Sequence, residues 1–183
     1  MCSSDLLNLA RCLDSINAQT DRDCRIIVVN DGNSVEMRDL VQSFQENMKD
    51  MPITYYQAPY RGKRGGHESV NLALSRLPDD VQFVTILNAD NRIYPTYIED
   101  MWHPEYDIVT CMVRMNDLPG ITLNGHSFSR RSMDRLNYTI RADIAARVKH
   151  LQHMDADCDY VLDCLAISEN GIYHVDKELA EHN

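Results

Sequence analysis

Two carboxylates in this sequence stand directly after apolar runs, where a buried strand would reach the edge of a sheet. Asp31 follows the run at residues 26–29, and Asp90 follows the run at residues 83–87. Uncharged runs of β-branched and aliphatic residues are typical of strands buried on both faces. Because open α/β sheets bind ligands at the carboxyl ends of their strands, both carboxylates are placed to act on one small molecule.

A glycine-rich basic segment lies between these two runs. Arg61, Lys63 and Arg64 alternate with glycines, and no carboxylate interrupts them. Glycines let backbone N–H groups approach phosphate oxygens, and a helix that begins after Gly66 would direct its positive end toward them. The segment therefore predicts a phosphate-binding loop, although a solvated basic loop would have the same composition.

A third acidic feature, residues 155–159, precedes a predicted helix. A carboxylate there can serve as a general base or can stabilise the positive end of the helix. A strand-end carboxylate could hold a divalent cation, and the cation and the basic loop could neutralise a diphosphate. A further carboxylate would then remain free to act as the base of a group-transfer reaction. Asp31 has a plainer interpretation as a turn former, because Gly32 follows it.

The elements that position these residues follow from hydrophobic periodicity. Strands are expected at residues 25–29, 53–56, 83–87, 108–113 and 172–175, and helices at residues 4–16, 34–48, 67–77, 96–102, 140–151 and 156–166. This alternation predicts an α/β fold, with a mostly parallel sheet flanked by helices. The polar loop at residues 116–131 carries His126, Ser127 and Arg130. These residues could contact an acceptor substrate, or the loop could be a flexible lid without specific contacts.

Composition limits the possible partners. The chain has 183 residues, is 44% hydrophobic and has a net charge of -10, which indicates a single domain and argues against nucleic acid or an anionic membrane as the main partner. The six cysteines include no CxxC pair, so reduced thiols are expected. No apolar stretch approaches the roughly 20 residues that span a bilayer, and no signal peptide is evident, so we expect a soluble cytoplasmic protein.

Taken in order, these motifs resemble the inverting glycosyltransferases of family 2, which have the GT-A fold. The match begins at Leu13-Asp14-Ser15-Ile16 and continues through residues 26–34. The resemblance implies one GT-A catalytic domain over residues 1–183, with a nucleotide-sugar-binding half (about 1–100) and an acceptor-side half (about 101–183).

The resemblance also implies roles for the donor-side residues. Asp31 would contact the base or ribose of a sugar nucleotide, and Asn71 matches an asparagine of the family pattern. The cations of the basic loop, Arg61, Lys63 and Arg64, would face the nucleotide and diphosphate.

Three further segments resemble the metal and base motifs of the family. Residues 88–91 resemble the DXD-type motif, in which Asp90 would hold Mn²⁺ or Mg²⁺ and Asn88 would bind ribose or a metal-bound water. Residues 179–182 resemble the segment that places a histidine, here His182, on the metal. Residues 156–160 resemble the acidic pair that contains the catalytic base, which by register is Asp157.

Two departures from the family pattern accompany these matches. Asp163 stands where the family commonly has an arginine, and the first helix begins almost at Met1, whereas the family begins with a strand that lines the nucleotide pocket. We therefore expect one pocket wall to be missing or replaced by another segment.

The function implied is metal-dependent, inverting transfer of a sugar from a nucleoside diphosphate sugar, with UDP as the expected nucleotide, to a hydroxyl. Two alternatives stay open. A sugar-nucleotide pyrophosphorylase would ordinarily carry its basic loop directly after the first strand, and here the loop comes later. A non-catalytic nucleotide-sugar binder would explain the amides at Asn88 and Asn91.

Overall fold

The computed structural model describes residues 3–32, 34–58, 66–118, 120–128, 132–149 and 156–183. The basic-loop cations Arg61, Lys63 and Arg64 lie outside the described residues, as do Arg130 and Asp155. All other residues given a candidate role above are described.

Seven helices and eight strands are present in the described ranges. The helices are α1 (Ser3–Asn17), α2 (Val35–Asn47), α3 (His67–Leu74), α4 (Tyr97–Asp100), the 3₁₀ turn η1 (Arg135–Asn137), α5 (Ala142–Ala145) and α6 (Ala156–Ala166). The strands are β1 (Ile26–Asn30), β2 (Ile53–Gln57), β3 (Phe83–Thr85), β4 (Arg92–Ile93), β5 (Ile108–Met115), β6 (Thr122–Leu123), β7 (Tyr138–Arg141) and β8 (Ile172–His182).

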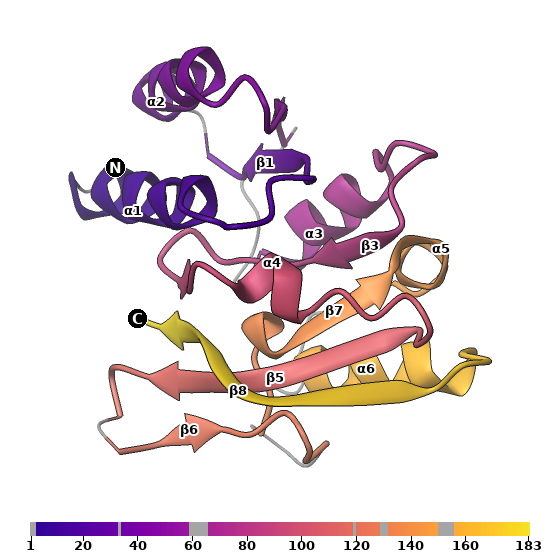
Figure 1. Cartoon of the computed structure of the whole chain (residues 1–183). Coiled ribbons are helices and arrows are strands. Elements are labelled where there is room, and N and C mark those ends of the chain that lie inside the picture. The colour runs from indigo at the N-terminus through magenta and orange to yellow at the C-terminus, as the bar shows by residue number, and fades with distance from the viewer. Residues whose placement is uncertain (1–2, 33, 59–65, 119, 129–131, 150–155) are drawn as a thin grey trace.

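The strands form two sheets, which Figure 1 shows with the long strands β5 and β8 running side by side. β1 and β2 pair in parallel, and a larger sheet has the order β3-β7-β5-β8-β4 with β6 also on β5. In the larger sheet only β5 and β8 are parallel, and the other ladders are antiparallel. The α/β class is as predicted, but the expectation of a mostly parallel sheet was wrong. Apolar runs report burial on both faces and do not report strand direction.

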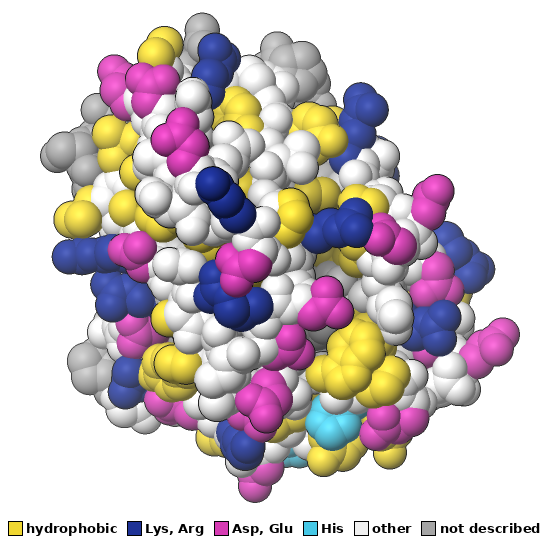
Figure 2. All heavy atoms as spheres, turned by 45° about the horizontal axis from the view of Figure 1, so that its top comes forward, with side chains coloured by type: hydrophobic (Ala, Val, Ile, Leu, Met, Phe, Trp, Pro, Cys, Tyr) yellow, Lys and Arg dark blue, Asp and Glu magenta, His cyan; other side chains and the backbone are white. Residues whose placement is uncertain are grey.

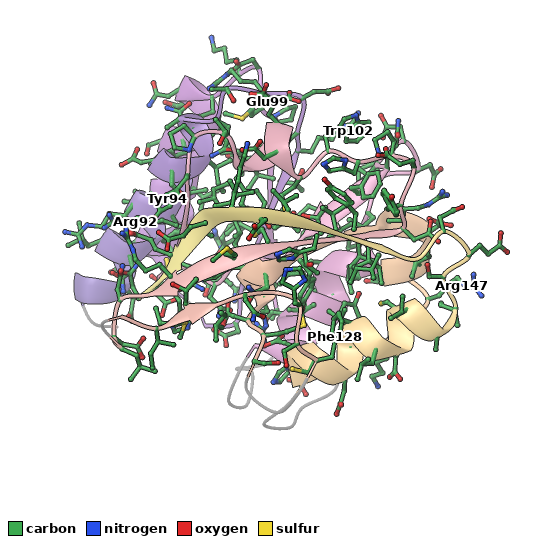
Figure 3. The ribbon with its side chains drawn as sticks, turned by 60° about the horizontal axis from the view of Figure 1, so that its bottom comes forward. Arg92, Tyr94, Glu99, Trp102, Phe128 and Arg147 are labelled. Carbon is green, nitrogen blue, oxygen red and sulfur yellow. The ribbon has the colours of Figure 1, made fainter. Side chains whose placement is uncertain are left out.

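Two hydrophobic clusters lie on opposite faces of the larger sheet. Successive residues of β5 point to opposite faces, so Val109 joins the cluster that α1 and α2 cover, and Ile108 joins the cluster that contains α3 and α6. Figure 3 shows α6 beneath the sheet, with Phe128 beside it. The first residues of α6 are therefore held against one face of the sheet.

Several predicted elements are confirmed and others are corrected. Ser34 caps α2 by accepting a hydrogen bond from the Met37 N–H at 3.1 Å, as expected from its place before the helix. The Thr96 side chain makes no capping hydrogen bond at the start of α4, and Glu99 accepts a hydrogen bond from the Thr20 hydroxyl at 2.9 Å. Of the helix predicted at residues 140–151, the first two residues belong instead to β7, since β3 and β5 pair with this strand on both sides, and Ala142–Ala145 form α5.

Asp107 fixes the start of β5 to the turn that follows α6. Its side chain is 2% exposed and accepts hydrogen bonds from the Ser168 hydroxyl, the Glu169 and Asn170 backbone N–H groups and the Asn170 side chain, at 2.8 to 3.0 Å. Burial by itself raises the pKa of this carboxyl, but the four hydrogen bonds outweigh it and lower the pKa to about 2. The ionised form is therefore the one that the fold stabilises.

We predict that Asp107→Asn lowers the free energy of unfolding by about 2 kcal/mol at pH 7, because a carboxyl with so low a pKa stabilises the folded state when ionised. The contribution is complete above the unfolded pKa near 4 and is lost as pH falls toward 2. Urea unfolding at pH 7 and pH 3 measures the difference. Asp79→Asn, at an exposed position, is the control, and a difference between wild type and Asp107→Asn that does not shrink in acid would contradict the account.

Candidate active site

The short turn η1 is the structural centre of the site. Asp134 caps it, since its side chain accepts from the Leu136 N–H at 3.1 Å and its own N–H donates to the Asn137 side chain at 2.8 Å. The Asn137 amide also donates to the carbonyls of Cys111 in β5 (2.8 Å) and Leu123 in β6 (3.3 Å). This reciprocal capping and anchoring holds the turn in one place on the sheet.

Arg135, in this turn, joins residues from three other segments. It is 6% exposed. Its Nε donates to Asp157 Oδ1 at 3.2 Å, its Nη1 donates to Asn88 Oδ1 at 3.0 Å, and its Nη2 lies 3.2 Å from His67 Nδ1. Two residues predicted from sequence, Asn88 and Asp157, thus contact the same guanidinium. We call Arg135 and the three residues that it contacts the arginine-centred site.

Asp157 lies in the first turn of α6 and is also held from the sheet. The Tyr138 hydroxyl lies 3.4 Å from Asp157 Oδ1 and donates toward it. Burial, followed by the negative charge of Asp157, raises the pKa of Tyr138 well above its usual value. The phenol therefore stays protonated as a donor, and the carboxylate is oriented by two neighbours.

His182, at the end of β8, lies between two carboxylates. Its Nε2 is 3.6 Å from Asp134 Oδ2, and its Nδ1 is 3.8 Å from Asp117 Oδ1. Both distances exceed those of a hydrogen bond, and the buried Nδ1 has no hydrogen-bond partner among the described residues.

Asp134 is unfavourably placed as an anion. Burial raises its pKa, and the nearby charge of Asp157 adds to the effect, although the Leu136 N–H and His182 oppose it. A divalent cation beside the Asp134 carboxylate and the His182 imidazole would offset this burial, and mixed oxygen and imidazole donors suit Mn²⁺. The residues present therefore fit a metal ion.

Asp90 lies near the same end of β8. The Asn183 side chain donates to the Asp90 carbonyl at 3.0 Å, and the Asn183 N–H donates to Asn91 Oδ1 at 3.2 Å. The Asp90 side chain is exposed. The turn at residues 88–91 and the chain end next to His182 are thus hydrogen-bonded neighbours.

β1, which Asp31 follows, and α3, which carries Asn71, lie above the larger sheet in Figure 1. Asp31 is half-buried in the turn after β1, where the Gly32 N–H donates to Asn30 Oδ1 at 2.9 Å. α3, which carries Asn71, packs against β1. Gly66 follows the basic loop in sequence, and a Cβ placed on it would lie 3.8 Å from Arg135 Nη1, so Gly66 itself lies beside Arg135.

Four residues of the site were missed by the sequence analysis: His67, Asp134, Arg135 and Tyr138. The one signal for them was the spacing of Asp134 and Asn137, which is that of a helix cap with a reciprocal partner. The turn that contains these residues follows a long polar loop, and no apolar run next to it predicts a buried element. Their roles depend on contacts between residues distant in sequence.

Comparison with known proteins identifies the family and the fold. The family model described as Glycosyl transferase family 2 matches residues 5–157, and the chain belongs to that family. Among solved structures, the fold is similar to "Mannosyltransferase PcManGT from Pyrobaculum calidifontis in complex with GDP-Man and Mn2+", with a TM-score of 0.67 and 14% identity over 96% of this chain. The predicted GT-A fold is thereby confirmed.

The chain covers 53% of that mannosyltransferase, about half of its length. A search among curated proteins found no match.

None of the described helices combines the length and apolar character needed to cross a membrane. Figure 2 shows acidic and basic side chains interspersed over one face of the molecule.

We predict that Asp134→Asn raises the melting temperature in the absence of metal, because asparagine keeps the capping oxygen and removes a buried charge. A gain of about 1 kcal/mol would correspond to roughly 2–4 °C for a chain of this size. The same variant should reduce the stabilisation that Mn²⁺ produces. Asp117→Asn, on the other side of His182, serves as the control, and a loss of stability in metal-free Asp134→Asn would contradict the interpretation.

Proposed function

We propose that this chain transfers a sugar from a nucleoside diphosphate sugar to a hydroxyl group, with inversion and with help from a divalent metal. One observation carries the proposal. Arg135 contacts both Asn88, at the carboxyl side of β3, and Asp157, at the head of α6, while the adjacent Asp134 lies beside His182. Residues expected on the donor, the base and the metal therefore converge on one capped turn.

In the proposed reaction, Asp157 accepts the proton of the acceptor hydroxyl. The acceptor oxygen then forms a bond to the anomeric carbon on the face opposite the leaving group, and the bond from that carbon to the diphosphate oxygen breaks. The nucleoside diphosphate departs with the electron pair. Arg135 and Tyr138 act as positioning residues, because they hold one oxygen of the base in place.

The donor is proposed to lie between the turn after β1 and the arginine-centred site. Asp31 and Asn71 would contact the nucleotide, and the cations Arg61, Lys63 and Arg64 would face the diphosphate. Gly66, which follows the basic loop in sequence, supports this arrangement, since it lies beside Arg135. Family resemblance favours UDP, whereas the structural neighbour holds GDP-Man, so both nucleotides belong in a binding test.

The metal is proposed to be Mn²⁺ or Mg²⁺, held by Asp90 and His182, with Asp134 as a further ligand. Such an ion stabilises the negative charge on a departing diphosphate. The raised pKa of Asp134 and the position of His182 Nε2, 3.6 Å from Asp134 Oδ2, support a cation here. The Mn²⁺ of the neighbouring mannosyltransferase agrees with this assignment.

We predict that Asp157→Asn lowers kcat by about 10²- to 10⁴-fold, the usual contribution of general-base help, and leaves donor affinity unchanged. Steady-state transfer kinetics and calorimetry with the nucleoside diphosphate and Mn²⁺ measure the two quantities. Asp163→Asn, exposed on the same helix, is the control. Transfer at the wild-type rate in Asp157→Asn would show that another group accepts the proton.

A screen of nucleotides by thermal unfolding tests the donor class. With Mn²⁺ present, a nucleoside diphosphate at 100 times its Kd should stabilise the protein by about 2.7 kcal/mol, because a ligand of the native state alone shifts unfolding by mass action. Nucleotides that do not bind should cause no shift.

Product analysis then separates the three candidate functions. Release of nucleoside diphosphate with transfer or slow donor hydrolysis supports the glycosyltransferase. Formation of a sugar nucleotide from a nucleoside triphosphate and a sugar 1-phosphate would indicate a pyrophosphorylase. Binding without any turnover would indicate a non-catalytic binder.

A further inference from the structure

A second group of possible metal ligands shares no residue with the set that contacts Arg135. His126, His174 and Asp176 each offer one ligand atom, and these atoms lie within 4.8 Å of one another. The group joins the segment after β6 to the middle of β8. It is the one such group of three found among the described residues.

His174 is oriented with a ring nitrogen available to a ligand. It lies opposite Thr110 of β5, and the Thr110 hydroxyl is 3.0 Å from its Nδ1. The same hydroxyl points toward the Tyr173 carbonyl at 3.5 Å, so it can accept from a protonated Nδ1. Nε2 then carries the lone pair, and this buried atom has no hydrogen-bond partner in the described part of the chain.

The neutral imidazole is the form that binds metals, and metal-bound histidines usually donate their second nitrogen to an oriented oxygen. The contact between His174 Nδ1 and the Thr110 hydroxyl oxygen is of this kind.

The backbone before His126 is fixed although its side chain is exposed. Gly125 has a φ of +66°, and a Cβ on it would lie 2.5 Å from the Cys111 carbonyl oxygen, so this close approach to β5 requires glycine. The His126 N–H donates to Asn124 Oδ1 at 3.0 Å. The rings of His126 and His174 are neighbours, with their centroids 3.3 Å apart.

Asp176 reaches the histidines through an irregularity in β8. Cys111 pairs with Val175 and the next residue of β5 pairs with Glu178, so Asp176 and Lys177 are extra residues in the strand. Such a bulge redirects side chains next to it. The carboxylate thereby joins two imidazoles that come from separate segments.

We propose that His126, His174 and Asp176 bind a transition-metal ion, with Zn²⁺ as the physiological candidate. Two imidazoles and one carboxylate form a borderline donor set that suits Zn²⁺ and leaves a position for water. The site differs from that at Asp134 and His182, where carboxylates predominate. A bound metal would link His126, in the segment after β6, to His174 and Asp176 of β8. His126 would then bind a metal ion rather than the acceptor substrate expected from the sequence.

Metal binding to the whole chain, stripped of metal by a chelator, tests the proposal. We expect Zn²⁺ titrated in calorimetry with excess Mg²⁺ to bind with one equivalent, and Co²⁺ to give the visible spectrum of a site with nitrogen ligands. His126→Ala and Asp176→Asn should each weaken Zn²⁺ binding by at least about 10-fold. Both positions are exposed, and circular dichroism confirms that the variants fold.

Two control variants locate the ion. His103→Ala removes a histidine that pairs with Glu105 at the surface, and His182→Ala removes the imidazole of the other site. Both should keep the Zn²⁺ affinity of the wild type. The proposal is overturned if Zn²⁺ does not bind under excess Mg²⁺, if the affinity survives His126→Ala and Asp176→Asn, or if His182→Ala abolishes it.

Discussion

The site depends on a buried guanidinium that must be paired. Arg135 is nearly inaccessible to solvent, and removing a charge from water is costly unless partners surround it. Asp157, Asn88 and His67 supply these partners from α6, the turn after β3 and the start of α3. Satisfying one side chain therefore fixes the relative positions of three segments that the sheet alone would leave independent.

Negative charge accumulates around this arginine. Burial raises the pKa of Asp134, and the negative charge of Asp157 adds to this effect. The chain as a whole is acidic, so an anionic diphosphate could approach only with local compensation. The basic loop and a divalent cation are the two sources of compensation that the proposed function uses.

Elements with strong local signals could be predicted from the sequence. The periodicity of α1, the Ser34 cap and the acidic start of α6 agree with the structure. The pairing of residues 138–141 could not be predicted, because the neighbours β3 and β5 decide it.

Resemblance to the family predicted Asn88, Asp157 and His182 as site residues. In the structure Asn88 and Asp157 contact Arg135 of η1, and His182 lies beside Asp134, which caps this turn. Asp134 and Arg135 were missed because their importance comes from tertiary contacts, which no local pattern encodes.

The most direct test of the proposed site is a crystal structure with a nucleoside diphosphate and Mn²⁺, with the metal located by its anomalous scattering. The account predicts an ion at roughly 2.0–2.2 Å from His182 and a carboxylate oxygen of Asp90 or Asp134. An ion bound elsewhere, with the nucleotide remote from Arg135, would contradict it.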